Sequence, residues 1–203
     1  RYRVEIAGGE IIEASAVVLA CRAWEAAEAT ATLDPELSGT LARIHPASLA
    51  VVHLGYAESD LPRRPDGFGF LVPREEGPRI LGTIWASSIF PGRAPPGHVL
   101  LTSMVGGAND PAAIGLGDDE LLGVVRNDLR RVMGIEAAPA FVRIFRHPRG
   151  IPQYELGHPA RLEAIDRRLA ALPGILVAGN SYRGISVNSC AEEAPRVAEA
   201  ALR

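Results

Sequence analysis

Hydrophobic and polar positions follow two different periods along the chain, and the change of period separates predicted strands from predicted helices. Alternation, or a short apolar run, predicts strands at 1–6, 10–13, 16–20, 48–56, 69–72, 79–85, 98–105, 141–145 and 175–178. An apolar stripe through Leu121, Val125 and Leu129 predicts a helix over 118–133, which Gly134 ends. Further helices are predicted at 24–32, 34–44 and 159–172, and a last one runs to Leu202.

The order of these elements favours an α+β fold. Several strands follow one another in the middle of the chain, and a strand–turn–helix arrangement closes it. The apolar run at 16–20 is typical of a strand that is buried on both faces of a sheet. Because the chain opens with Arg1 inside a hairpin-like alternation, we expect it to be a fragment of something longer.

Composition and charge narrow the classes of protein. The 203 residues are 47% hydrophobic and 22% charged, enough for one large or two small domains and unlike a disordered or fibrous chain. A net charge of -3 gives no reason to expect a nucleic-acid partner. With only Cys21 and Cys190, a disulfide framework is excluded and a cytoplasmic location is expected. Every basic residue is Arg, which excludes a Walker A loop and lysine Schiff-base chemistry.

The strand–turn–helix segment at 175–188 is the strongest candidate for chemistry. Gly179 and Gly184 let the backbone approach a ligand, and the helix N-terminus offers free N–H groups to an electron-rich group. An ordinary crossover explains the same pattern. Ser181 is a poor hydrolase nucleophile, because position 183 is Arg and no His follows it. The five histidines lack metal-ligand spacing, and no G-x-G-x-x-G is present.

Five blocks of sequence carry a family resemblance. In order, residues 67–73 (GFGFLVP), 80–85 (ILGTIW), 101–107 (LTSMVGG), 151–158 (IPQYELGH) and 178–188 (AGNSYRGISVN) resemble FAD-dependent protoporphyrinogen oxidases of the amine-oxidase-like flavoprotein superfamily. The resemblance covers essentially the whole chain, as the C-terminal half of such an enzyme. The chain differs from the usual pattern at Ala86 and Ser189, where Asp is usual, and at His147, where Trp is usual.

The resemblance implies an FAD-dependent, six-electron oxidation of protoporphyrinogen IX to protoporphyrin IX, with dioxygen as acceptor and hydrogen peroxide as product. Coproporphyrinogen III oxidation on the same scaffold is one alternative, and a non-catalytic porphyrin-binding domain is another. It also implies a mixed-sheet substrate domain at 23–150. Residues 1–22 would return from an FAD-binding, Rossmann-like α/β domain, whose C-terminal part would be 151–203.

Site residues follow from the same resemblance, and no side chain is assigned as catalytic and none as a metal ligand. The cofactor-binding residues would be Gly179, Asn180, Gly184, Ile185, Ser186, Val187 and Asn188. The porphyrinogen would contact Phe68, Gly69, Leu71 and Met104. Peripheral membrane association through an N-terminal half, the electron acceptor and the oligomeric state stay open.

Overall fold

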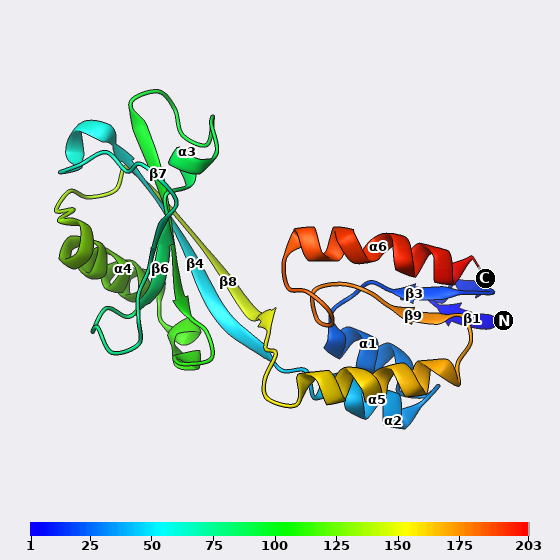
Figure 1. Cartoon of the computed structure of the whole chain (residues 1–203). Helices are drawn as coiled ribbons and strands as arrows, with labels where there is room; N and C mark the ends of the chain where they lie inside the picture. Colours follow the sequence, from blue (N-terminus) through cyan, green and yellow to red (C-terminus); the bar gives the residue numbers. More distant parts are fainter. Residues whose placement is uncertain (203) are drawn as a thin grey trace. The chain divides into compact units, whose positions relative to one another are not determined.

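The computed structural model describes residues 1–202, which form two compact units (Figure 1). The first unit is built from residues 1–46 and from 152 onwards, and the second from residues 47–151. Both mix helices and strands, as the sequence predicts. The two helices at 23–42 belong to the first unit, although the sequence placed them with the segment 23–150. They do so because Ala26, Leu37 and Leu41 are buried in one cluster with Ile165 and Val177.

Two short strand pairs form the centre of the first unit. The strands β1 (Tyr2–Glu5) and β2 (Ile11–Ala14) make an antiparallel hairpin, whereas β3 (Val17–Leu19) runs parallel to β9 (Ile175–Val177). The expectation that 16–20 is buried on both faces is wrong, since Val18 is 41% exposed. Among the described residues β9 is the single strand that pairs with β3, so the buried interior of a wide sheet is not formed there.

Helices cover both sides of the β3–β9 pair. In Figure 1, α6 (Val187–Ala201) lies on one side, and α1 (Ala23–Thr30), α2 (Pro35–Ala42) and α5 (His158–Ala170) lie on the other. Asp34 caps α2 by accepting the N–H groups of Glu36 and Leu37 at 3.1 and 3.0 Å. Its second oxygen accepts from the Arg168 guanidinium at 2.6 Å, which fastens α2 to α5.

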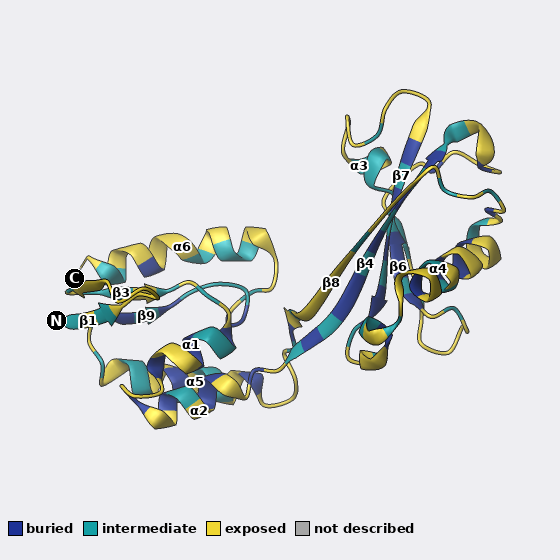
Figure 2. Ribbon diagram, turned by 180° about the vertical axis from the view of Figure 1, so that it is seen from behind, coloured by how far each residue is buried: buried dark blue, intermediate teal, exposed yellow. Residues whose placement is uncertain are grey.

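The second unit is one five-stranded sheet in the order β5-β6-β7-β4-β8. The strands are β4 (Pro46–Ala57), β5 (Gly69–Leu71), β6 (Ile80–Ile84), β7 (His98–Gly106) and β8 (Phe141–Pro152). Figure 2 shows β4 largely buried and the edge strand β8 largely exposed. Short helical turns lie at Glu58–Asp60, Ala86–Ile89 (α3) and Pro111–Gly115.

One face of this sheet is covered by α4 (Asp118–Met133), which has the predicted bounds and ends at Gly134 with φ +69°. The apolar stripe of α4 packs on the side chains of β4 and β7 that point the same way. Full burial of Leu121 or Leu129 contributes about 1.5–3 kcal/mol each. The buried carboxylate of Asp128 accepts the N–H groups of Arg79 and Ile80 at 2.7 and 3.0 Å, and so fixes α4 to the start of β6.

The opposite face of the sheet carries the alternate residues of each strand. Along β7, Val99, Leu101 and Ser103 are buried toward α4, while Leu100 and Thr102 are half-buried on the other face.

No helix of the described residues is long and apolar enough to cross a membrane.

Candidate functional site

The predicted cofactor-binding residues all lie in the turn between β9 and α6 or in the first two positions of α6. Gly179 leaves β9 with φ +111°, a conformation that a residue with a β-carbon rarely adopts. Ser186 caps α6, and its Oγ accepts the Ser189 N–H at 3.0 Å. Within residues 1–202, the N–H groups of Val187 and Asn188 in the first turn of α6 donate no hydrogen bond. The turn therefore presents a helix N-terminus with two available donors.

Apolar side chains stand beside these donors. Val187 is 85% exposed and Ile185 is 48% exposed, and the polar Ser186 and Asn188 are exposed as well. Gly179, Asn180 and Gly184 are half-buried at the base of the turn. Such a surface suits a ligand that has an apolar ring system and hydrogen-bond acceptors at one edge.

Position 184 has no room for a side chain, whether or not a ligand is bound. Its φ is not positive, so the conformational freedom of glycine is needed at Gly179 and not here. A β-carbon at position 184 would overlap the Cβ of Ser189 in the first turn of α6 and would also lie 2.8 Å from the Ser189 Oγ. The turn and the helix that follows it are therefore packed against each other through this glycine.

Ser181 lies in the same turn and has a structural role. Its side chain is 1% exposed, and Oγ accepts the N–H of Ala23 at the beginning of α1 at 3.2 Å. A buried hydroxyl engaged in this way agrees with the prediction that Ser181 is not a nucleophile.

The predicted substrate-binding residues lie in the second unit, and two of them share one row of its sheet. Leu71 in β5 pairs with Gly82 in β6, and Gly82 pairs with Met104 in β7. Leu71 and Met104 thus flank a glycine on the face opposite α4. Leu71 is 86% exposed, so this row is an open apolar strip.

The other two predicted residues border this strip. Gly69 occupies the same face two positions before Leu71, and its φ of +132° brings its backbone against Thr83 of β6. Phe68 precedes β5 and is 77% exposed. The cofactor-binding and substrate-binding predictions therefore fall on separate units, one set on each.

A polar pair interrupts the apolar face on the neighbouring strands. The Nδ1 of His53 in β4 lies 2.9 Å from the Thr102 hydroxyl of β7, and the Phe145 ring packs edge-on to the imidazole with centroids 5.7 Å apart. Partial burial, followed by the charge of Arg93, lowers the pKa of His53. The imidazole is therefore neutral at neutral pH.

Comparison with known proteins decides the family. The family of flavin-containing amine oxidoreductases matches residues 1–202. The chain belongs to this family. It is 30% identical to a coproporphyrinogen III oxidase of Bacillus subtilis (strain 168) over 202 residues, or 99% of the chain. It is 32% identical to the chloroplastic protoporphyrinogen oxidase 1 of Spinacia oleracea over 196 residues, or 90% of the chain.

A solved structure shows that the chain also has a fold similar to that of a related protein. A protein from Exiguobacterium sp. 255-15, provisionally described as a protoporphyrinogen oxidase, matches with a TM-score of 0.77 and 26% identity. The match covers 100% of this chain and 42% of that one. The chain spans 43% of the Bacillus relative and 34% of the spinach relative. The resemblance to the protoporphyrinogen oxidase family and the FAD cofactor that it implies are thereby confirmed.

The turn at 179–188 fits one end of such a flavin. The exposed Ile185 and Val187 can contact ring carbons, and the N–H groups of Val187 and Asn188 can donate to ring oxygens or nitrogens. The net positive end of the α6 dipole favours electron density at the same place. No glycine-rich phosphate loop occurs in the 203 residues, so this turn is suited to the ring system and not to the pyrophosphate.

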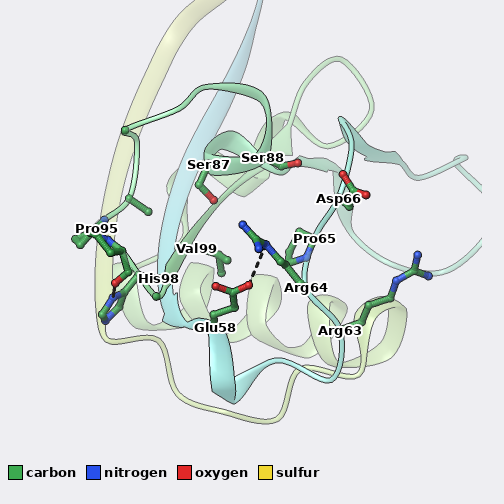
Figure 3. Close-up of a pocket in the computed structure, with 14 residues that line it drawn as sticks. Glu58, Arg63, Arg64, Pro65, Asp66, Ser87, Ser88, Pro95, His98 and Val99 are labelled. Carbon is green, nitrogen blue, oxygen red and sulfur yellow. Dashed lines mark hydrogen bonds and ion pairs between the residues drawn. The ribbon is translucent and has the colours of Figure 1, made fainter.

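The most pronounced cavity of the second unit lies elsewhere. It is a cavity of about 720 Å³, and its lining includes Arg64 and Glu58, which form an ion pair at 2.9 Å. Figure 3 shows this pair together with Ser87, Ser88 and His98. None of the predicted substrate-binding residues lines it. Burying the apolar macrocycle against this ion pair and these hydroxyl groups would be unfavourable, so this cavity is a poor match for the ring system of a porphyrinogen.

The sequence assigns no role to two residues that lie next to the turn. Tyr154 and His158 belong to the IPQYELGH block, and both contact the backbone of the turn. The block marks them as members of a motif, but its spacing alone does not show what they contact.

Proposed function

We propose that the chain is part of an FAD-dependent oxidoreductase of porphyrin and haem biosynthesis, which oxidises protoporphyrinogen IX to protoporphyrin IX. The reaction removes six electrons and six hydrogens, and three molecules of dioxygen would become three of hydrogen peroxide. The spinach relative, which carries the name of this activity and matches 90% of the chain, supports the proposal.

In this proposal the first unit positions the cofactor. FAD, when bound, supplies the hydride acceptor for the reaction. Gly179, Asn180, Gly184, Ile185, Ser186, Val187 and Asn188 would form the surface against its ring system. The available N–H groups of α6 would orient the ring edge, and the exposed side chains would exclude water from it.

The second unit would bind the substrate on the open face of its sheet. The observation that carries this role is the row Leu71–Gly82–Met104, in which two apolar side chains flank a residue without one. The apolar face of the macrocycle can lie against such a row, and Phe68 and Gly69 would border it. The residues of this face supply shape and desolvation, and no acid or base is assigned among them.

Coproporphyrinogen III is the second candidate substrate. The Bacillus relative, which carries that activity in its name, matches 99% of the chain. The two porphyrinogens differ at two peripheral positions, which carry propionates in coproporphyrinogen III and vinyls in protoporphyrinogen IX, and we assign no residue of the open face a role in selecting between them. Two free cysteines support the cytoplasmic location that we propose with either substrate, and peripheral membrane contact is a separate question for a vesicle-binding test.

The experiment compares both substrates on one protein. We define the holoprotein as the longest natural protein that contains these 203 residues, loaded with FAD. Protoporphyrinogen IX and coproporphyrinogen III are supplied separately in air, and the fluorescence of the oxidised porphyrin is followed together with hydrogen peroxide. A higher kcat/KM for protoporphyrinogen IX supports the first candidate and the reverse order supports the second. Oxidation of neither substrate above the rate of free FAD would reject both.

A further inference from the structure

The hydroxyl of Tyr154 closes the turn between β9 and α6. It donates to the carbonyl of Asn180 at 2.8 Å and accepts the N–H of Gly184 at 3.0 Å. These two backbone groups stand near the beginning and the end of the turn, so one phenol oxygen ties its ends together. The tyrosine comes from the segment before α5, 26 and 30 residues away along the chain.

His158 holds the middle of the same turn. It is the first residue of α5, its side chain is 5% exposed, and Nε2 lies 2.8 Å from the carbonyl of Tyr182. Because a carbonyl only accepts hydrogen bonds, Nε2 must carry a proton. The buried Nδ1 has no partner among the described residues, so Nε2 is the ring nitrogen that makes the contact with the turn.

The two side chains also support each other. Their rings stack with centroids 4.0 Å apart and an interplanar angle of 12°. Movement of either ring would disturb the hydrogen bonds of both, so Tyr154 and His158 act as one rigid contact. Together they bind the backbone of residues 180, 182 and 184.

The turn has other anchors as well: Ser181 Oγ accepts the N–H of Ala23 at 3.2 Å, and the Tyr182 side chain is buried in the core of the first unit. Within the described part of the turn, one backbone–backbone bond is present, from the Tyr182 N–H to the Gly179 carbonyl at 3.4 Å. Arg183 adds side-chain ion pairs to Asp166 and Glu193 at 2.5 and 3.3 Å, but these do not restrain the carbonyls of residues 180 and 182. Among the described residues, the side-chain groups that bind the carbonyls of residues 180 and 182 are the Tyr154 hydroxyl and the His158 Nε2.

We propose that Tyr154 and His158 are positioning residues for the flavin. They hold the 180–184 backbone so that Ile185 and the N–H groups of Val187 and Asn188 face the cofactor ring. This inference rests on the proposed contact between the turn and FAD, but it does not depend on which porphyrinogen is oxidised, or on whether one is.

The test uses Tyr154→Phe and Tyr2→Phe in the holoprotein. Tyr154→Phe keeps the stacked ring and removes the oxygen that serves both backbone groups. Tyr2→Phe is the matched control, because the Tyr2 hydroxyl also donates to a backbone carbonyl at 2.8 Å, that of Pro173, in the same unit but away from the turn. Two variants of His158 then test its hydrogen bond: His158→Gln retains an N–H donor, whereas His158→Phe keeps a planar ring but has no donor.

We expect Tyr154→Phe to weaken FAD binding about tenfold, equivalent to about 1.4 kcal/mol. The visible circular dichroism and the midpoint potential of the bound flavin should change with it. Tyr2→Phe should leave all three properties as they are. His158→Phe should resemble Tyr154→Phe, and His158→Gln should lie closer to the unaltered holoprotein.

Two outcomes would overturn the inference. One is a Tyr154→Phe holoprotein whose FAD affinity, circular dichroism and potential all match those of Tyr2→Phe. The other is that the longest natural protein that contains these 203 residues binds no FAD at all. A holoprotein that binds FAD and shows these changes, yet oxidises neither porphyrinogen, would support the positioning role while rejecting the proposed function.

Discussion

Replacement of Gly184 by Ala tests whether the turn and α6 are packed as the structure shows. The added β-carbon would overlap the Cβ of Ser189, which is fixed to the backbone of α6, so the turn or the start of the helix would have to shift. Relieving such an overlap costs about 1–3 kcal/mol. Because a shift of the turn also breaks the bond from the Gly184 N–H to Tyr154, about 1 kcal/mol is added to this cost. We therefore expect Gly184→Ala to lower the free energy of unfolding by about 2–4 kcal/mol.

A second substitution makes this prediction specific. Ser189→Gly removes the overlapping atoms, and the new β-carbon would then have the Ser189 Cα as a neighbour at 3.5 Å, an ordinary contact. Ser189→Gly alone should cost about 1 kcal/mol, as glycine does in a helix. The double variant should be more stable than Gly184→Ala by about 1 kcal/mol or more, a non-additive result that only a direct contact produces.

Urea unfolding of the 203-residue chain, followed by circular dichroism, measures these differences. Gly179→Ala is the control, because its nearest neighbour would be 3.7 Å away and its cost arises from φ +111°, at roughly 1 kcal/mol. Ser189→Gly should not rescue Gly179→Ala. Unchanged stability of Gly184→Ala, or equal rescue of both alanine variants by Ser189→Gly, would refute the packing argument.

The remaining predictions concern the substrate face, acid stability and the cofactor. Leu71→Arg in the holoprotein should raise KM for the porphyrinogen at least tenfold with unchanged FAD content, whereas Leu202→Arg, an equally exposed leucine, should not; an unchanged KM removes Leu71 from the substrate face. Hydrogen bonds from the Leu37 N–H and then from Arg168 lower the pKa of Asp34, so its stabilisation is present above 3.8 and is lost as the pH falls through the lowered value. Unfolding midpoints of Asp34→Asn should therefore approach those of the unaltered chain in acid, and a constant gap would contradict this cause. The 203-residue chain alone should be colourless, with a Kd for FAD weaker than micromolar, because binding costs on the order of 4–15 kcal/mol and no phosphate loop offsets it; a yellow, stoichiometrically flavinated chain would contradict this.

The sequence predicts best the elements whose own residues determine them. The helix at 118–133 has its predicted bounds because its apolar stripe and Gly134 specify it locally. By contrast, β8 extends to Pro152, beyond the predicted end at residue 145. Arg146, His147 and Pro148 interrupt the alternation there, and an edge strand with one neighbour tolerates them.

Contacts between distant segments are what the sequence does not provide. The row that joins Leu71 to Met104 depends on strand register, and a shift of one residue would turn either side chain to the other face. The contacts of Tyr154 with the turn join segments that are 26 and 30 residues apart. The overlap that excludes a side chain at position 184 likewise arises only when the turn and α6 are seen together.

We propose that this chain belongs to a flavoprotein whose flavin receives electrons from a porphyrinogen. Rapid anaerobic mixing of the holoprotein with protoporphyrinogen IX tests it directly, since no oxygen is present to hide the step. We expect the visible absorption of oxidised flavin to disappear at a rate at least as fast as turnover in air. The absorbance should return when oxygen is admitted. Flavin that stays oxidised in the presence of excess protoporphyrinogen IX, and of excess coproporphyrinogen III, would contradict it.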